Sequence, residues 1–290
     1  MIKINICIAQ FIPISILKRF GIFIELNKPP KFFVPSDGKG ALALLQWSPN
    51  WMVDILSKLM TCTQPGFIDV GANVGQTLLA YKLVSNGRYI GIEPNPACSA
   101  FVDELLVENG MDDSFVITLA LSDKNGFSSL YSAYATDTGA TMMTNLRNIT
   151  GRHKQIVSMN TFDNFLEECE FEDPGIIKID VEAYELEVIR GMSRLLKRSK
   201  SIIICEVLGT AKDRPLEIKE KRNSEIIQLL NTYNYTVYNL QKSEDLKKII
   251  KLKEINQFPN VYWSEENKES FDYIFVPNSM VDDVNKIFNE

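Results

Sequence analysis

The stretch from Phe67 to Thr77 constrains the fold of this chain more than any other. A short apolar run is followed by small residues, among them Gly71 and Gly75, and then at once by a helical pattern. This order of strand, glycine turn and helix is typical of the point where a Rossmann-type sheet opens a nucleoside site. Glycine at these two positions lets the backbone come close to a ligand and to the packed helix, where a Cβ would obstruct.

The chemistry of this turn argues against a phosphate loop. The turn lacks a Gly-Lys-Ser/Thr ending, and it places the carboxylate of Asp69 where a phosphate would be repelled. An acid at this point favours a cationic or hydroxyl-rich ligand. It also disfavours a nicotinamide-dependent oxidoreductase, because the turn has no G-x-G-x-x-G pattern and Asp69 would face a pyrophosphate.

A second apolar strand follows, and it ends in Glu93. The acid lies about twenty residues beyond the glycine turn, the spacing at which a carboxylate accepts hydrogen bonds from ribose hydroxyls. The two features together predict a nucleoside-type site. The alternative is an ordinary βαβ unit in which Asp69 and Glu93 are only exposed carboxylates at strand ends.

Composition narrows the class of protein. With 290 residues the chain can form one large α/β domain with an appendage, or two small domains. The net charge of -6 and the pI near 5.1 argue against a broad nucleic-acid surface. The five cysteines include no C-x-x-C pair, so neither a zinc site nor a disulfide framework is indicated. A reducing compartment fits best, and we expect a cytoplasmic protein.

From Gly66 onward, strand and helix patterns alternate regularly, which predicts a doubly wound parallel sheet. Two late strands, at 235–240 and 271–276, are expected to form an antiparallel edge pair. The predicted parallel strands are 66–70, 88–93, 114–121, 175–181 and 201–207, and the predicted helices are 74–86, 96–109, 184–197 and 222–233.

Residues 1–60 show no such alternation, and we predict an N-terminal extension followed by one domain at 61–290. Ser48 and Pro49 are suited to begin a helix that runs through Leu59. The mostly apolar residues 4–17 are too few to span a bilayer, and no cleavage site follows them. We expect this segment to pack on the domain or on a second subunit, so a homo-oligomer formed through the extension is one hypothesis.

Two later segments depart from the regular pattern. Residues 122–160 hold several glycines, many serines and threonines, and the single histidine, His153. Long connections at the carboxyl ends of parallel strands commonly cover the ligand, so we interpret this one as an acceptor-binding insert, with a peripheral hairpin as the alternative. The five lysines of residues 242–254 favour the solvated face of a basic amphipathic helix.

A series of short motifs, each weak alone, occurs in order along residues 64–277. The motifs are Phe67-Ile68-Asp69-Val70-Gly71-Ala72-Asn73-Val74-Gly75, Ile92-Glu93-Pro94-Asn95-Pro96, Leu119-Ala120-Leu121-Ser122-Asp123, Thr161-Phe162-Asp163, Ile177-Lys178-Ile179-Asp180-Val181-Glu182, Glu185 with Val188-Ile189-Arg190-Gly191, and Ile204-Cys205-Glu206. With this ordered set, the chain resembles the FkbM family of S-adenosylmethionine-dependent methyltransferases. It departs from the family pattern at Ala183, where glycine is usual, and at Phe162, where leucine or valine is usual.

The resemblance implies a Rossmann-like class I methyltransferase fold and methyl transfer from S-adenosylmethionine to an acceptor oxygen. Family members act on hydroxyls of sugars, glycoconjugates and macrolide-type natural products. By the same resemblance, Glu93 would hold the ribose hydroxyls, and Asp180 would face the methionine end of the cofactor. The remaining cofactor residues would be Asp69, Gly71, Asn73 and Gly75 around methionine and ribose, with Asn95, Ala120, Leu121 and Ser122 flanking adenine.

A hydroxyl acceptor must lose a proton during or just after attack, so a general base is expected. The candidates are Asp180, Glu182, Glu206 and His153. Glu206 ends an apolar strand beside the one that ends in Asp180, and partial burial there would raise its pKa toward a useful range. The three acids could in principle offer oxygen ligands to Mg²⁺, but nothing in their spacing demands it, and we predict no metal.

The leading hypothesis is therefore an O-methyltransferase that acts on a glycan or another small hydroxylated metabolite. Its partners would be that acceptor and S-adenosylmethionine, with no nucleic acid and no transmembrane segment. The alternative is a binding or scaffold protein that keeps the fold without catalysis, which Ala183 and the unexplained N-terminal region favour.

Overall fold

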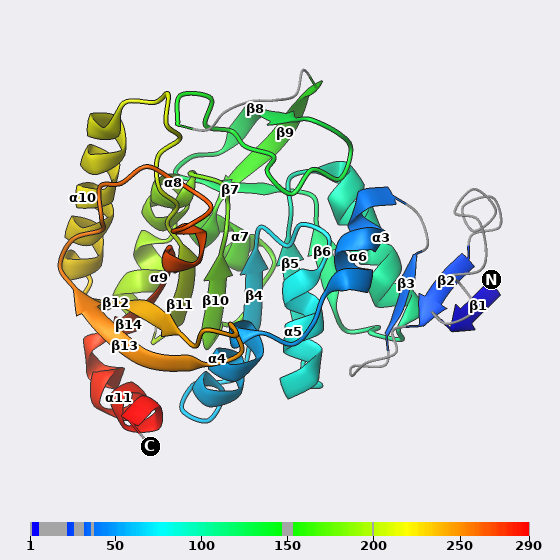
Figure 1. Ribbon diagram of the computed structural model, residues 1–290, viewed down its shortest axis with the longest axis horizontal. Coiled ribbons are helices and arrows are strands. Elements are labelled where there is room, and N and C mark those ends of the chain that lie inside the picture. Colours follow the sequence, from blue (N-terminus) through cyan, green and yellow to red (C-terminus); the bar gives the residue numbers. More distant parts are fainter. Residues whose placement is uncertain are drawn as a thin grey trace.

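An eight-stranded sheet, ordered β13-β12-β14-β11-β10-β4-β5-β6, dominates the computed structural model (Figure 1). The model describes residues 2–5, 22–25, 32–35, 38–146, 153–198 and 200–289. The strands from β11 to β6 run parallel, whereas β14, β12 and β13 are antiparallel. The predicted mostly parallel sheet with an antiparallel edge is confirmed. The strands are β4 (Phe67–Val70), β5 (Tyr89–Ile92), β6 (Phe115–Ile117), β10 (Ile176–Ile179), β11 (Ile202–Glu206), β12 (Tyr235–Lys242), β13 (Ile249–Ile255) and β14 (Asp272–Pro277).

Helices cover both faces of this sheet and bury its central strands on both sides. Every residue of β4, β5 and β10 is buried, as expected for parallel strands between two helical layers. One face packs on α4 (Trp51–Leu59), α5 (Gln76–Val84), α6 (Pro96–Glu108) and α11 (Val281–Asn289), and the other on α7 (Phe162–Glu168), α8 (Glu185–Arg190), α9 (Ser193–Arg198) and α10 (Leu216–Thr232).

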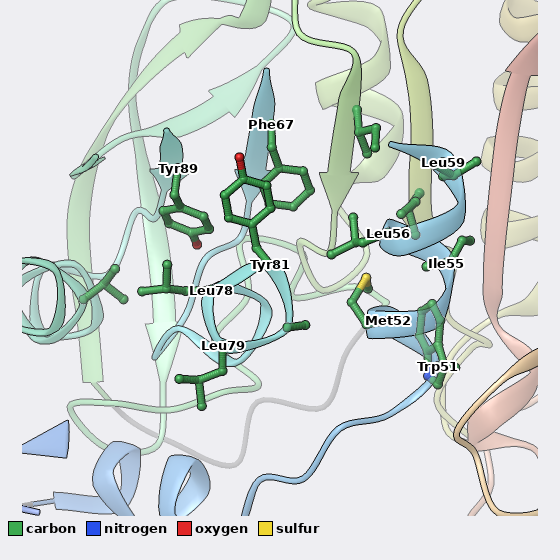
Figure 2. Close-up of a cluster of buried hydrophobic side chains, with 14 of the residues drawn as sticks. Trp51, Met52, Ile55, Leu56, Leu59, Phe67, Leu78, Leu79, Tyr81 and Tyr89 are labelled. Carbon is green, nitrogen blue, oxygen red and sulfur yellow. The ribbon is translucent and has the colours of Figure 1, made fainter. Parts of the chain in front are cut away.

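The N-terminal helix α4 shares a hydrophobic core with the sheet. Figure 2 shows its side chains, Leu56 and Leu59 among them, beside those of β4 and α5. The rings of Phe67 and Tyr81 stack there with centroids 4.8 Å apart. The helix begins two residues later than predicted, because Asn50 is the N-cap and its side chain accepts a hydrogen bond from the Met52 amide at 3.1 Å. The domain boundary at residue 60 stays a prediction.

Among the described residues, the other N-terminal elements are a helix, α3 (Gly38–Gln46), and a small sheet of β1 (Ile2–Asn5), β2 (Ile22–Glu25) and β3 (Phe33–Pro35). Most of the apolar segment 4–17 lies outside the described residues, so the expectation for its packing stays a prediction. Among the residues that the model describes, no helix combines the length and the apolar character needed to cross a membrane.

The predicted single strand 114–121 is wrong. The chain leaves the main sheet after β6, and β7 (Ala120–Ser122) joins β9 (His153–Thr161) and β8 (Gly126–Ser132) in a separate sheet of order β7-β9-β8. The predicted helix 184–197 is likewise divided into α8 and α9 at Gly191. A Cβ at Gly191 would lie 1.9 Å from the carbonyl oxygen of Ser122, so this close approach to β7 requires glycine.

The lysine-rich stretch 242–254 is not the helix that its pattern favours. Its second half, residues 249–254, belongs to the edge strand β13, which is antiparallel to β12 and leaves Lys251 and Lys253 exposed. Pairing with a neighbouring strand outweighs the local pattern here, and lysines on an edge strand discourage further strand pairing. Lys242 differs from the others because it belongs to β12 and its side chain is buried.

Candidate active site

A cavity of about 530 Å³ opens at the carboxyl ends of the central strands. Its volume is in the range typical of small-molecule sites, and its position is the one expected for a ligand in an open α/β sheet. All three tryptophans of the chain contribute to its wall: Trp47 and Trp51, which are close in sequence, and the distant Trp263.

The glycine turn after β4 forms one side of the cavity in a left-handed conformation. Gly71, Asn73 and Gly75 have φ angles of 83°, 48° and 90°. A Cβ at Gly71 would lie 1.8 Å from the carbonyl oxygen of Asp180, and one at Gly75 would lie 3.1 Å from Leu105. Gly71 is therefore required for close packing of two strand ends, while Gly71 and Asn73 also line the cavity.

Glu93 lies in the cavity wall just after β5. Its Oε2 accepts a hydrogen bond from the Asn73 amide and its Oε1 one from the Asn95 amide, both at 2.8 Å. The residue is only 6% exposed. Burial raises the pKa of this carboxyl from 4.5 to about 7, against the opposing effect of the two amides. Glu93 is thus a preoriented acceptor that gains from further hydrogen-bond donors.

Asn95 lies behind the cavity rather than in its wall. Its Oδ1 accepts from the Ala97 amide and caps α6, and its Nδ2 donates to the carbonyl oxygen of Ala135 at 2.7 Å. The second bond fastens the insert to the adjoining strand end. Four residues of the insert region line the cavity: Leu130, Asp137, Thr138 and Ala140. The insert thus contains an antiparallel β8–β9 pair and residues that line the cavity, while its binding of an acceptor stays a prediction.

Asp69 is wholly buried beneath the turn and does not line the cavity. The Tyr89 hydroxyl donates to its Oδ2 at 2.6 Å, and the Lys178 ammonium lies 3.4 Å from its Oδ1. Burial raises the pKa of Asp69, and Lys178 opposes that change. The structure places Asp69 in a position to support the ligand site from below.

Lys178 is a cavity residue that sequence reasoning missed. It lies 3.2 Å from Asp180 as well as beside Asp69, and its Nζ donates to the carbonyl oxygen of Gly71 at 3.3 Å. Burial disfavours the ammonium, but Asp180 and Asp69 outweigh it and raise the pKa of Lys178. The detectable signal was a lysine in the middle of the apolar strand Ile176–Ile179, since such a position is buried and a buried charge needs partners.

Glu206 ends β11 beside Asp180 and lines the cavity, as predicted. Across the antiparallel pair it faces Asp272, which sequence reasoning missed and which also lines the cavity. Burial, and then the negative charges of Asp180 and Asp272, raise the pKa of Glu206 well above its ordinary range. Burial also raises the pKa of Asp272, and its ion pair with Lys242 acts against that.

Glu182 and Ala183 form a left-handed pair shortly after β10, with φ angles of 52° and 78°. Three side chains hold them. Thr141 donates to the Glu182 carbonyl at 2.7 Å, and Arg222 donates to the Ala183 carbonyl at 3.1 Å. Glu185 accepts from the Ala183 amide at 2.8 Å. The positive φ of Ala183 gives the physical reason for glycine in the family pattern at this position.

The remaining predicted residues lie away from the cavity. Ala120, Leu121 and Ser122 are buried in β7, where the Ser122 hydroxyl lies 3.1 Å from that of Tyr184, and none of them lines the cavity. His153 is exposed at the start of β9 and is also absent from the cavity wall. The adenine-flanking and catalytic roles assigned to these four residues stay predictions.

The far wall joins the N-terminal helix to the antiparallel edge of the sheet. The Lys242 ammonium lies 4.4 Å from the centre of the Trp51 ring, forms an ion pair with Asp272, and lies 3.2 Å from Glu269. All four residues line the cavity. In the described part of the chain, no group of three or more histidine, cysteine or acidic side chains is arranged to hold a metal ion.

The donor and acceptor set fits S-adenosylmethionine. The Glu93 carboxylate is suited to ribose hydroxyls, and the buried Oδ1 of Asn73 has no hydrogen-bond partner among the described residues. The acids of the cavity suit a cationic ligand, since acid side chains outnumber the lysines Lys178, Lys242 and Lys268 in its wall.

The fold and the position of this site are those of a Rossmann-like methyltransferase domain. The methyltransferase FkbM domain matches residues 69–237, more than half of the chain, and the chain belongs to this family. The predicted family is confirmed. No curated protein matches the sequence.

Solved structures resemble the chain only distantly. Methyltransferase FkbM from Methylobacillus flagellatus is 14% identical with a TM-score of 0.44, and the match covers 73% of this chain and 43% of that one. An O-methyltransferase from Bacillus cereus, solved with SAH, is 12% identical with a TM-score of 0.39, and the match covers 81% of this chain and 85% of that one. This chain thus spans less than half of the Methylobacillus protein.

Proposed function

We propose that this protein transfers a methyl group from S-adenosylmethionine to a hydroxyl of a glycan or another small hydroxylated metabolite. The observation that carries the proposal is that one cavity joins two different carboxyl sites. Glu93, fixed by two backbone amides, is suited to ribose hydroxyls. Glu206, at the end of β11, is suited to an acceptor hydroxyl that must lose a proton.

Glu93 and Asn73 would hold the ribose, and Asp180 with Lys178 would adjoin the methionine part. When bound, S-adenosylmethionine supplies an activated methyl group on a sulfonium. The work of the chain is then to orient the acceptor and exclude water, and orientation can supply about 7–11 kcal/mol in well-placed cases. Acids that bind the sulfonium strengthen cofactor binding, but they do not by themselves lower the barrier, since transfer removes that charge.

Glu206 is the general base of this proposal. It lines the cavity, and its raised pKa means that the carboxylate form becomes populated only as the pH rises past the ordinary range of a glutamate. Turnover is therefore expected to rise with pH, and Glu206→Gln should remove that dependence together with about 10²–10⁴-fold in kcat. Asp180 and Glu182 also line the cavity and remain alternative bases.

The test begins with calorimetric titration of the full chain with S-adenosylmethionine and S-adenosylhomocysteine, beside Glu93→Ala. Binding that is lost in the variant supports the cofactor site, and screening with a panel of hydroxylated glycans then seeks the acceptor. Absence of binding to both compounds would overturn the proposal. Turnover unchanged in excess chelator would dispose of a role for Mg²⁺.

The second candidate is a scaffold that binds the cofactor without catalysis. The observation in its favour is Ala183, which replaces the usual glycine in a left-handed turn. Ala183 directly follows Glu182, one of the alternative bases. Cofactor binding with no methyl transfer to any glycan of the panel, in the wild type and equally in Ala183→Gly, would favour this candidate.

A further inference from the structure

A second hollow, of about 400 Å³, lies between helix α10 and the loop of residues 256–260. We call it the amide groove. Its floor is formed by the buried residues Asn223, Ile227 and Phe258. Its rim is exposed and consists of Glu220, Ser224, Gln228, Asn256, Gln257, Pro259 and Asn260. In Figure 1 the segment after β13 (orange) runs alongside α10 and then turns back toward the middle of the molecule.

The chemistry of the amide groove is polar but almost uncharged. Five of its ten residues carry a side-chain amide, one carries a hydroxyl, and the single ionisable side chain is Glu220, whose Oε2 accepts from Asn260 at 3.2 Å. Such a set does not select an ion. It offers many paired donors and acceptors, since each amide carries one of each kind side by side.

The floor of the amide groove contains one buried polar atom without a hydrogen-bond partner among the described residues. Asn223 is only 5% exposed, and its Oδ1 has no hydrogen-bond partner among the described residues. A buried acceptor without a partner costs free energy, and native proteins rarely leave one unsatisfied. A ligand hydroxyl at this point would satisfy it.

We propose that the amide groove binds a neutral saccharide unit. Vicinal hydroxyls of a sugar match the paired donors and acceptors of the rim amides, and the Asn223 oxygen is placed to accept from one of them. The apolar floor of Ile227 and Phe258 suits the C–H face of a pyranose ring.

The amide groove is tied closely to the cavity of the active site. Asn260 lies in its rim, and Trp263 lines the cavity. Three residues span at most about 11 Å when fully extended, so the two sites lie within reach of a short oligosaccharide. Backbone bonds fix the connecting segment, because the Thr210 amide donates to the Val261 carbonyl at 3.1 Å and the Trp263 amide to the Thr210 carbonyl at 2.8 Å.

The amide groove then holds a second sugar of the acceptor while the first occupies the cavity. This step rests on the proposed function, because it takes the acceptor to be a glycan. A peptide fits less well. An extended peptide gains most from a free strand edge, and the amide groove is formed by a helix and by a loop without a strand.

The experiment is hydrogen exchange of the full chain saturated with S-adenosylhomocysteine, with galactose, mannose, rhamnose, N-acetylglucosamine and their neutral disaccharides as probes. A neutral tetrapeptide is the competing probe. The test variant combines Asn256→Ala and Gln257→Ala, both exposed and therefore tolerable for folding. The matched control is Lys253→Ala on the neighbouring strand β13, outside the amide groove.

The expected result is protection of peptides that cover 220–228 and 256–260 by at least one sugar, with disaccharides binding more tightly than their monosaccharides. The double variant should weaken this binding about tenfold, the loss of one to two hydrogen bonds, while Lys253→Ala leaves it unchanged. No protection by any sugar, protection by the peptide only, or protection confined to the active-site cavity would each overturn the proposal.

The two proposals fail separately. If the wild type does not bind S-adenosylhomocysteine, the proposed function is wrong. If it binds S-adenosylhomocysteine but no saccharide protects the amide groove from hydrogen exchange, only this inference is wrong.

Discussion

At the scale of single residues, Glu93 combines near-complete burial with two backbone donors. The amides hold both carboxylate oxygens in place, yet they do not compensate fully for the loss of water, and the pKa stays raised at about 7. A ligand that donates hydroxyls to this group supplies part of what water no longer provides. Cofactor binding and protonation of Glu93 are therefore linked.

This linkage predicts that affinity for S-adenosylhomocysteine rises with pH. Ribose hydroxyls favour the charged carboxylate, so the bound protein has a lower Glu93 pKa than the free protein and must release a proton when it binds below about pH 7. Calorimetry from about pH 5.5 to 8 should show affinity climbing by up to about tenfold per unit and then levelling. Glu93→Gln should bind weakly with a flat profile. An equally flat profile in the wild type would contradict the linkage.

Ala183 gives a residue-scale prediction about stability. Its φ of 78° costs an L-residue roughly 1–2 kcal/mol, while glycine loses about 0.5–1 kcal/mol more in conformational entropy on folding. Ala183→Gly should therefore stabilise the protein by roughly 0.5–1 kcal/mol in urea denaturation. The matched control is Ala100→Gly on the exposed face of α6, expected to destabilise by about 1 kcal/mol. Equal destabilisation by both changes would refute the argument.

Single residues were predictable from the sequence where local geometry alone determines their position. Glu93 was found because an acid after a short strand emerges at the carboxyl edge of the sheet. Whether Asp69 faces the ligand could not be read in the same way, since Tyr89 and Lys178 from two neighbouring strands decide its burial. Asp272 was missed because its position beside Glu206 depends on an antiparallel register that pairs distant segments.

At the scale of elements, residues 133–146, which follow β8, act as a strap over the cavity. Asn95 holds the Ala135 carbonyl near one end, and Thr141 holds the Glu182 carbonyl near the other. Between these anchors Asp137 accepts from the amides of Ala133 and Gly139 and shapes the part that lines the cavity. The strap is thus fastened to the strand ends that carry Glu93 and Asp180.

Thr141 tests this arrangement with a matched pair of variants. Its buried hydroxyl donates to Glu182 and accepts from the Met143 amide at 2.9 Å, so Thr141→Val leaves two polar groups unpaired and costs about 1–3 kcal/mol. Thr141→Val should also release S-adenosylhomocysteine faster in stopped-flow measurements, with faster hydrogen exchange across 133–143. Thr141→Ser keeps the hydroxyl and should retain most of both properties. Identical behaviour of the two variants would argue against the strap.

Helices and strands were predictable from the sequence where they are formed by residues close together along the chain. The alternation from β4 to β11 predicted the parallel sheet because each βα unit forms locally. The separate sheet β7-β9-β8 was not predictable, since Ala120 pairs with Met159 across the whole insert. The lysine-rich strand β13 was mistaken for a helix because its pairing with β12, rather than its own periodicity, determines its structure.

At the scale of the whole molecule, one wall of the cavity joins the N-terminal part of the chain to the antiparallel edge of the sheet. Trp51 comes from the N-terminal helix α4, and its amide donates to the Leu246 carbonyl in the turn between β12 and β13 at 2.8 Å. Asp54 on the same helix accepts from the Ile249 amide at 2.9 Å. Because α4 also shares the main core, segments outside the family match complete the site.

Lys242 makes the central side-chain contacts between α4 and the antiparallel edge of the sheet. Its side chain lies buried between the Trp51 ring and the carboxyls of Asp272 and Glu269. In Lys242→Met the ring keeps an apolar neighbour but two acids lose their cation, so we expect a loss of about 3 kcal/mol in unfolding free energy, near the lower end for a buried pair because Glu269 is half-exposed. The charge-preserving Lys242→Arg should lose less.

The same change should alter the pH dependence of the reaction. Removal of the Lys242 charge disfavours the Asp272 carboxylate, so the pKa of Asp272 rises and this acid becomes neutral over a wider pH range. A neutral Asp272 no longer opposes ionisation of Glu206, which should then ionise at lower pH. We therefore expect the rising limb of turnover in Lys242→Met to move to lower pH, with Lys242→Arg close to wild type. A limb that moves to higher pH would contradict this expectation. It would mean that the Lys242 charge acts on the Glu206 carboxylate directly rather than through Asp272.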